Sequence, residues 1–275
     1  MCIAILTTTH PNYRYIIINN RDEFLSRPTA PASWWSPSPS PSPSPISIAD
    51  PVTEIPHILS ARDLARPAHG IWLGVTKEGR AAVLTNCLET DCARAVGGED
   101  DVEGFIEELR RDEELQDVGG FNLLFRDLSE LQSHDGDEEG GLVIISNRSA
   151  TSQCCTGDSN AVRRIGGKTG ETIALSNMTL GEEFDGGEKW TKIVLGEELL
   201  GNAVGESLRV SEDEDALVER FFDVLLTDTL PRLTGKQKAE ACMGLLRESI
   251  FIPVIGEKVQ HNQEGVHSSE TLLHP

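Results

Sequence analysis

The sequence has no long apolar run and no secretion signal, which excludes several classes of protein at once. No apolar stretch approaches the ~18 residues that a membrane-spanning helix needs. The apolar run at residues 3 to 6 is too short for a signal peptide and has no basic segment before it. We therefore expect a cytoplasmic protein that is not secreted and has no transmembrane segment.

Paired cysteine motifs are also absent. The six cysteines stand at positions 2, 87, 92, 154, 155 and 242, without a C-x-x-C pair and without histidines at zinc-ligand spacing. We expect free thiols in a reducing compartment and no structural metal site. The pairs Cys87 with Cys92 and Cys154 with Cys155 are soft ligands for a metal or haem iron, but free cysteines more often pack as small apolar residues.

Basic residues are scarce. The chain carries 24 Lys and Arg against 45 Asp and Glu, a formal charge of −21, which repels nucleic acid at long range. The acids gather between residues 89 and 117, with 12 acids and 3 bases, whereas residues 1 to 86 carry 6 acids and 7 bases. We expect no nucleic acid partner, a nearly neutral working surface and an acidic segment that aids solubility.

Glycine loops for nucleotides are missing as well. GGKTG at residues 166 to 170 contains lysine and threonine but lacks the spacing of a phosphate-binding loop, and no dinucleotide fingerprint is present. No cofactor is therefore expected to be required.

Short strands and amphipathic helices make up the rest of the pattern. A hairpin is predicted from β-branched runs around a turn at residues 10 to 12, and a second from runs around a short glycine-containing turn at residues 77 to 79. The first hairpin uses residues 2–7 and 13–19, the second 71–76 and 80–85, further strands 121–125, 142–146 and 172–177, and helices 100–111, 188–200 and 211–228. Ser211 and Glu214 form the pattern of a capping box for the last helix. Hairpins layered with helices indicate an α+β fold.

Residues 36 to 45 interrupt this pattern with Ser-Pro repeats. Proline removes backbone donors, so this segment is expected to be an inserted, extended loop. Two interpretations stay open: a tolerated low-complexity insertion, or an interaction segment read by a protein partner or modified by phosphorylation.

Cys2 is a candidate nucleophile because it directly follows the initiator methionine. If Met1 is removed, Cys2 carries both a thiol with a pKa near ~8.5 and an α-amino group with a pKa near ~7.7 to 8.0. The amine can then act as the base for the thiol of the same residue, so no distant histidine is required. The alternative is that Cys2 is simply the first residue of a buried strand.

Polar residues at other strand ends are candidate partners of Cys2. Asn86 and Asn177 each close a predicted strand and offer amide donors for an oxyanion, although asparagine also ends strands for conformational reasons. Arg21 and Asp22 follow the second strand, where they would orient the amine or bind a substrate carboxylate. A purely structural ion-pair network is the competing interpretation for that pair.

Several motifs in a fixed order point to a known family. MCI at the start, NNRDEFLSRPTAPASWW at 19 to 35, GIWLGVTKEGRAAVLTN at 70 to 86, GFNLL at 120 to 124 and LSN at 175 to 177, with Trp190 and Lys192 downstream, resemble the transport and Golgi organisation protein 2 family, also called the NRDE family. The resemblance runs over roughly residues 1 to 200.

The resemblance implies a fold and a site. The family is similar to N-terminal nucleophile hydrolases, which implies a four-layer αββα sandwich with Cys2 as the nucleophile. It further implies that Asn177 and Asn86 are oxyanion donors and that Arg21 and Asp22 face the N-terminus. The activity would be cleavage of an amide or thioester bond.

The resemblance also implies a cellular role and a boundary. Family members are associated with Golgi organisation and secretion, with a cytoplasmic, Golgi or mitochondrial location, and with haem or acyl-CoA lipids as ligands. We expect one domain over residues 1 to 256, incomplete at its C-terminal end because the family's Tyr-Gly-Thr-Arg-like motif is missing, and a disordered tail at 257 to 275. Three hypotheses follow: a ligand-handling protein without turnover, a Cys2-dependent hydrolase, and an interaction module that works through its Ser-Pro loop.

Overall fold

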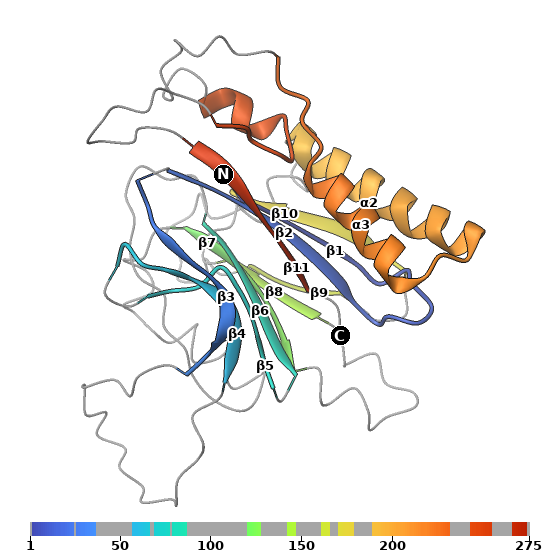
Figure 1. Ribbon diagram of the computed structural model, residues 1–275, viewed down its shortest axis with the longest axis horizontal. Coiled ribbons are helices and arrows are strands. Elements are labelled where there is room, and N and C mark those ends of the chain that lie inside the picture. Colours follow the sequence, from blue (N-terminus) through green and yellow to red (C-terminus); the bar gives the residue numbers. More distant parts are fainter. Residues whose placement is uncertain are drawn as a thin grey trace, which may run out of the picture.

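Two antiparallel sheets and a layer of helices make up the computed structural model (Figure 1). The structure describes residues 2–24, 26–36, 57–66, 69–77, 79–86, 120–127, 142–146, 161–165, 170–178, 189–231, 243–254 and 266–273. One sheet has four strands in the order β10-β1-β2-β11, and the other has seven in the order β3-β4-β5-β6-β7-β8-β9.

The elements follow one another as strands first and helices afterwards. In chain order they are β1 (Ile3–Thr7), β2 (Ile16–Phe24), β3 (Thr29–Trp35), β4 (Ile58–Asp63), β5 (Leu73–Thr76), β6 (Arg80–Asn86), β7 (Phe121–Asp127), β8 (Leu142–Ser146), β9 (Ala161–Ile165), β10 (Thr172–Ser176), α2 (Thr191–Val210), α3 (Glu214–Leu225), the 3₁₀ helix η3 (Met243–Arg247) and β11 (Val266–Leu273).

Both predicted hairpins are confirmed. β1 pairs with β2, and β5 pairs with β6 across Gly79, whose φ of 90° suits a residue without a side chain. The strands predicted at 121–125, 142–146 and 172–177 are β7, β8 and β10. β2 continues through the polar NNRDEF stretch, which was expected to be a loop, because residues 17 to 24 pair with β11 on its other side.

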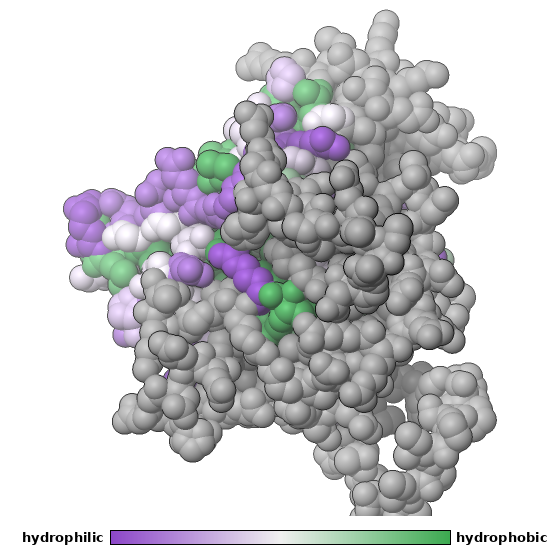
Figure 2. All heavy atoms as spheres, turned by 180° about the vertical axis from the view of Figure 1, so that it is seen from behind, coloured by the Kyte–Doolittle hydropathy of each residue, from purple (hydrophilic) through white to green (hydrophobic). Residues whose placement is uncertain are grey.

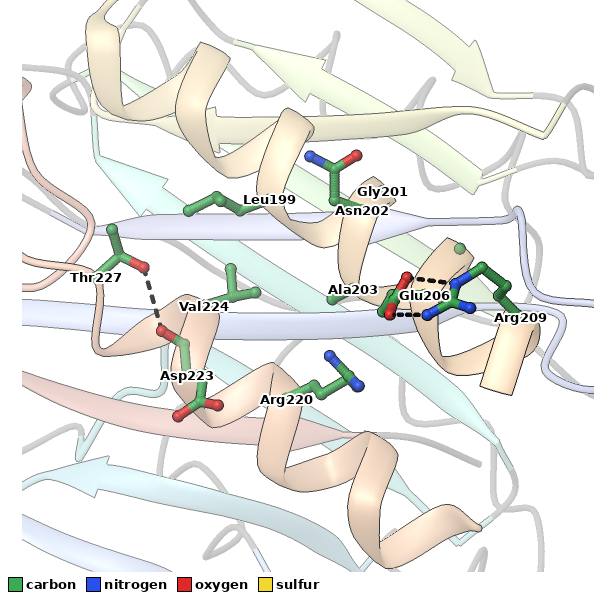
Figure 3. A pocket seen from close by; sticks show the side chains of 11 residues that line it. Leu199, Gly201, Asn202, Ala203, Glu206, Arg209, Arg220, Asp223, Val224 and Thr227 are labelled. Carbon is green, nitrogen blue, oxygen red and sulfur yellow. Dashed lines mark hydrogen bonds and ion pairs between the residues drawn. The ribbon is translucent and has the colours of Figure 1, made fainter. Parts of the chain in front are cut away.

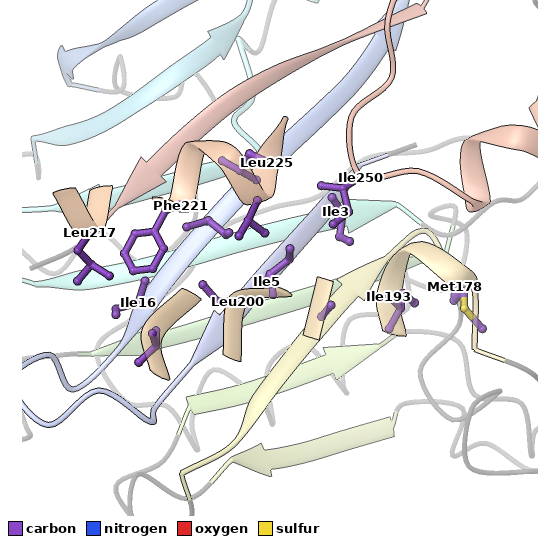
Figure 4. Packing of buried hydrophobic residues seen from close by; sticks show 14 residues of the cluster. Ile3, Ile5, Ile16, Met178, Ile193, Leu200, Leu217, Phe221, Leu225 and Ile250 are labelled. Atoms are coloured by element: carbon purple, nitrogen blue, oxygen red, sulfur yellow. The ribbon is translucent and has the colours of Figure 1, made fainter. Parts of the chain in front are cut away.

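The four-stranded sheet lies between two apolar cores. Its helix-facing core is drawn in Figure 4 and includes Ile3, Ile5 and Ile16 from the sheet and Leu200 and Phe221 from α2 and α3. α2 packs closely on β1, since a Cβ added at Gly196 would lie 2.8 Å from the Ile5 side chain.

The helix-facing core and a second core between the two sheets together explain why all five residues of β1 are buried. The members of the second core come from both sheets: Ala4, Leu6, Tyr15, Ile17, Leu73, Val83, Leu124, Leu142, Ile144, Ile173 and Leu175. A strand covered on both faces reads as a continuous apolar run, which is how IAIL appears in the sequence. The α+β class is therefore confirmed, with a helix layer and two sheets in the described residues.

The start of α3 differs from the predicted capping box. The N-cap is Asp213, whose Oδ1 accepts a hydrogen bond from the backbone N–H of Ala216 at 2.9 Å. Ser211 instead ends α2 in the left-handed region with φ 54°. The prediction failed because only three residues separate the two helices. The same polar segment ends α2 at Ser211 and begins α3 at Asp213.

The expected disordered tail is wrong for residues 266 to 273. This segment forms β11 and extends the four-stranded sheet beyond β2, with Ser269 opposite Arg21. Backbone pairing needs no apolar sequence, so β11 closes an edge that the residue pattern of the tail did not reveal. The amphipathic surface helix expected at 100–111 lies outside the described residues. The same holds for the Ser-Pro repeats and for Cys87, Cys92, Cys154, Cys155 and Cys242.

Candidate functional site at Cys2

Cys2 stands at the entrance to the central strand β1 and is 7% exposed. Ile3 is opposite Ser176 on β10 and opposite Asn20 on β2. The same registers continued by one residue place Cys2 between Asn177 and Arg21. The Cys2 carbonyl oxygen accepts a hydrogen bond of 2.7 Å from Ser176 Oγ, so the residue just before β1 is held directly to β10.

Strand alternation sorts the polar residues of β2 onto two faces. Asn20 and Asp22 lie on the face toward the helices, where Asn20 Nδ2 donates to the carbonyls of Leu225 at 2.6 Å and Ile250 at 3.1 Å. Asn19 and Arg21 lie on the face toward the other sheet, the face that Cys2 shares with Ala4. Arg21 and Asp22, predicted together, therefore lie on opposite faces of β2, because adjacent strand residues point in opposite directions.

Asp22 and Lys192 form a buried ion pair on the helix side. Lys192 Nζ lies 3.3 Å from Asp22 Oδ2, both side chains are 0% exposed, and Nζ also donates to the Leu246 carbonyl at 3.2 Å. The pair ties β2 to α2 and to η3. The structural interpretation of the Asp22 carboxylate is thus the one that the contacts favour.

Arg21 belongs to a cationic and aromatic group between the sheets. Its guanidinium lies 3.9 Å from the centroid of the Trp72 ring, and Arg27 lies 5.2 Å from the same ring. Arg27 binds Asp63 at 2.6 Å and Glu23 at 2.7 Å, and Arg21 Nη2 is 3.8 Å from Glu23. This group therefore places two guanidinium groups on the Cys2 side of β2.

The two predicted asparagines meet across the gap between the sheets. Asn177 Nδ2 donates a hydrogen bond to the backbone carbonyl of Asn86, which joins the end of β10 to the end of β6. An amide nitrogen carries two hydrogens, so this contact leaves the second N–H of Asn177 for an oxyanion. Asn86 contributes its backbone to this contact, which differs from the amide donor expected of it.

Burial raises the pKa of the Cys2 thiol above its ordinary value. The positive amino terminus of the chain opposes this rise, the Asp22 carboxylate adds to it, and a hydrogen bond from the Asp22 backbone and the Lys192 ammonium oppose it. At neutral pH the thiol is accordingly protonated, and it needs a nearby base before it can act as a nucleophile.

The sequence pointed to Cys2, Arg21 and Asn177, which lie on neighbouring strands at one end of the four-stranded sheet. It missed Trp72, which directly precedes β5, and Asn122 on β7 of the other sheet, and it gave Lys192 no role. The alternation of polar residues in NNRDE was a usable signal for two faces. No local pattern reports the contacts between the sheets.

A separate groove lies between α2 and α3 and shares no residue with this group. It has a volume of about 750 Å³ and is lined by residues such as Asn202, Glu206, Arg220 and Asp223 (Figure 3). Glu206 is held by Arg209 at 2.6 Å, within the groove itself. The groove thus offers no reacting group comparable to Cys2.

The described surface seen in Figure 2 is mainly hydrophilic with smaller hydrophobic areas.

Within the described ranges, no helix is long and apolar enough to cross a membrane. The same ranges hold no group of three or more His, Cys, Asp or Glu side chains arranged to bind a metal ion.

The fold and the site together define a class: an α+β sandwich protein with a buried cysteine at the amino end of a central strand. Within that class, this chain belongs to the Transport and Golgi organisation 2 family, whose model matches residues 1–265. The resemblance seen in the sequence motifs is thereby confirmed.

Similar proteins include three eukaryotic relatives. The chain is 24% identical over 254 residues to an uncharacterised protein of Saccharomyces cerevisiae, covering 84% of this chain and 70% of that protein. It is 28% identical over 225 residues to the human Transport and Golgi organization protein 2 homolog, covering 78% of this chain and 65% of the relative. The Bos taurus homolog is 26% identical over 229 residues, covering 78% and 66%. The chain thus spans about two thirds of the length of these relatives.

Among solved structures, the N-acylethanolamine-hydrolyzing acid amidase ortholog of Caenorhabditis elegans matches with a TM-score of 0.35 and 11% identity. The match covers 80% of this chain and 85% of that structure. A TM-score of this size does not establish a shared fold, so the α+β assignment rests on the sheets and helices themselves.

Proposed function

We propose that this protein acts in transport and Golgi organisation as a cytoplasmic hydrolase, and that Cys2 is its nucleophile for an amide or thioester. The carrying observation is the position of Cys2 directly ahead of the central strand β1, with Arg21 on one neighbouring strand and Asn177 at the end of the other. A nucleophile between a cation and an amide donor can bind a carbonyl substrate and stabilise the oxyanion that forms on it.

The chemistry follows from one residue with two groups. Once Met1 is removed, the α-amine takes the thiol proton while sulfur bonds to the carbonyl carbon and the oxyanion forms. The C–N or C–S bond of the substrate then breaks, and the amine passes its proton to the leaving group. Water cleaves the acyl-cysteine and restores the thiol. In this scheme Asn177 donates to the oxyanion and Arg21 binds an anionic part of the substrate.

A direct test combines intact-mass measurement with turnover. We expect the mass of the purified protein to lack Met1 and Cys2→Ala to lose at least about 10³-fold in turnover of amide or thioester substrates. Thermal unfolding of Cys2→Ala should match the wild type, since one small side chain is changed. Undiminished turnover by this variant would exclude the mechanism.

A second candidate function is ligand handling without turnover, with haem or an acyl-CoA lipid as the ligand. The observation that favours it is the burial of Cys2, which raises the thiol pKa and disfavours the thiolate. Titration of the purified protein with haem and with acyl-CoA is the measurement. Saturable micromolar binding that survives in Cys2→Ala, with no turnover in the wild type, would replace the hydrolase proposal by this one.

A further inference from the structure

Hydrogen bonds from the side chains of Asn122 and Thr85 to the end of β10 join the two sheets next to the candidate site; we call these two residues the clasp. Asn122 on β7 is 2% exposed, and its Nδ2 donates to the Met178 carbonyl at 2.7 Å and to the Ser176 carbonyl at 3.3 Å. Thr85, its register partner on β6, donates from Oγ1 to the same Ser176 carbonyl at 3.0 Å. Two side chains of the seven-stranded sheet therefore hold the backbone that ends β10.

The orientation of the Asn122 amide is fixed by what surrounds it. Its Nδ2 lies within hydrogen-bond distance of three oxygens, those of Met178, Ser176 and Thr85, the last at 3.3 Å. Its Oδ1 is buried without a hydrogen-bond partner among the described residues. Only the donor side of this buried amide therefore makes hydrogen bonds with described residues, which indicates that Asn122 is oriented to bind the carbonyls of Ser176 and Met178.

What the clasp holds is the part of β10 next to Cys2. Residues 176 and 178, which accept its hydrogen bonds, flank Asn177 on both sides. Ser176 also donates from Oγ to the Cys2 carbonyl at 2.7 Å. Movement of this segment away from the seven-stranded sheet would shift Asn177 and uncover the Cys2 thiol together.

We infer that Asn122 and Thr85 are positioning residues, which fix Asn177 beside Cys2 and keep the thiol buried. The part of this inference that concerns catalysis by Asn177 and Cys2 rests on the proposed function. The part that concerns the burial of the Cys2 thiol does not depend on it. Neither residue reaches the reacting atoms in this account; both act through the backbone of Ser176 and Met178.

The test replaces Asn122 by leucine, which is similar in size and cannot donate. The readout is the alkylation rate of Cys2 by iodoacetamide between pH 6 and 10, followed by mass spectrometry of the peptide that ends at Arg14. We expect the pKa of the thiol to fall toward its ordinary value, and the rate at neutral pH to rise about tenfold for each unit of that fall. Turnover should fall about 10²-fold through misplacement of Asn177.

The matched control is Ser146→Ala. Ser146 is 0% exposed, lies opposite Asn122 on the neighbouring strand β8 and donates to the Phe121 carbonyl at 3.2 Å. The variant therefore removes a buried hydrogen bond beside Asn122 and leaves the donors of Asn122 and Thr85 in place. Its Cys2 alkylation profile should match the wild type. A folded Asn122→Leu with the wild-type profile would overturn the inference, and so would Ser146→Ala giving the same change as Asn122→Leu.

If Asn122→Leu does not fold, Thr85→Val decides, since it keeps the shape of threonine and removes only the hydroxyl that donates to Ser176 and accepts from Asn122. A smaller change in the same direction supports the clasp, and an unchanged profile overturns it. Absence of turnover in the wild type would count against the hydrolase proposal alone, because the alkylation profile of Cys2 needs no substrate.

Discussion

Replacing Lys192 with methionine is expected to lower the free energy of unfolding by about 3 to 5 kcal/mol. The Asp22 carboxylate, 3.3 Å from Lys192 Nζ, would then remain in a site where both side chains are fully buried. Methionine fills much of the same volume, so the loss reflects the removal of the cation that pairs with a buried carboxylate more than a cavity. The Leu246 carbonyl would lose its 3.2 Å donor as well.

Denaturant-induced unfolding, followed by far-ultraviolet circular dichroism, measures this effect. Lys189→Met is the matched control, because Lys189 pairs with Glu197 at 3.0 Å while 36% exposed, three residues earlier in the chain. An exposed pair of that kind should cost below about 1 kcal/mol. A Lys192→Met protein as stable as this control would contradict a buried, charged pair.

A double variant separates the charge from the packing. Asp22→Leu combined with Lys192→Met removes both charges, and we expect it to recover most of the stability lost by Lys192→Met alone. Recovery would show that the single variant suffers from the loss of the cation beside the Asp22 carboxylate. Equal instability of the single and double variants would instead assign Lys192 a packing role through its aliphatic stem.

Local sequence patterns predicted the strands that are marked by a continuous apolar run or by a short turn with glycine. The continuous apolar runs of β1 and β8 and the hairpin around Gly79 are examples, because period and turn chemistry are properties of neighbouring residues. β11 could not be predicted in this way. Its sequence VHSSETLL joins the sheet through backbone pairing with a strand more than 240 positions earlier.

The site was predictable where one strand or one residue carries the chemistry. Cys2 stood out because its own amine can serve its thiol, and Asn177 because it closes a strand. The sequence did not show that Arg21 and Asp22 lie on opposite faces, since the stretch expected to be a loop continues as a strand with alternating sides. Asn122 and Trp72 reach the group only through the packing of the two sheets, which no local spacing encodes.

An N-terminal extension that cannot be removed should abolish turnover while leaving the fold intact. With Gly-Ser placed ahead of Cys2, the thiol remains but its nitrogen becomes a peptide nitrogen that takes no proton. A positioned general base contributes about 10² to 10⁴-fold, so turnover should fall by that factor. The buried thiol, with its raised pKa, depends on such a base more than an exposed thiol would.

A protease-cleavable version of the same extension provides the control, since cleavage that leaves Cys2 as the first residue should restore the activity. Circular dichroism and thermal unfolding of the two extended proteins should agree with the wild type, because the change lies ahead of β1 (Ile3–Thr7), where the sheet pairing begins. The pH profile of the restored protein should rise through the pKa of an α-amine, near ~7.7 to 8.0, as the base loses its proton. If the uncleavable protein turns over substrate at the wild-type rate, the amine of Cys2 is not the base, and the proton must pass to another group near the thiol.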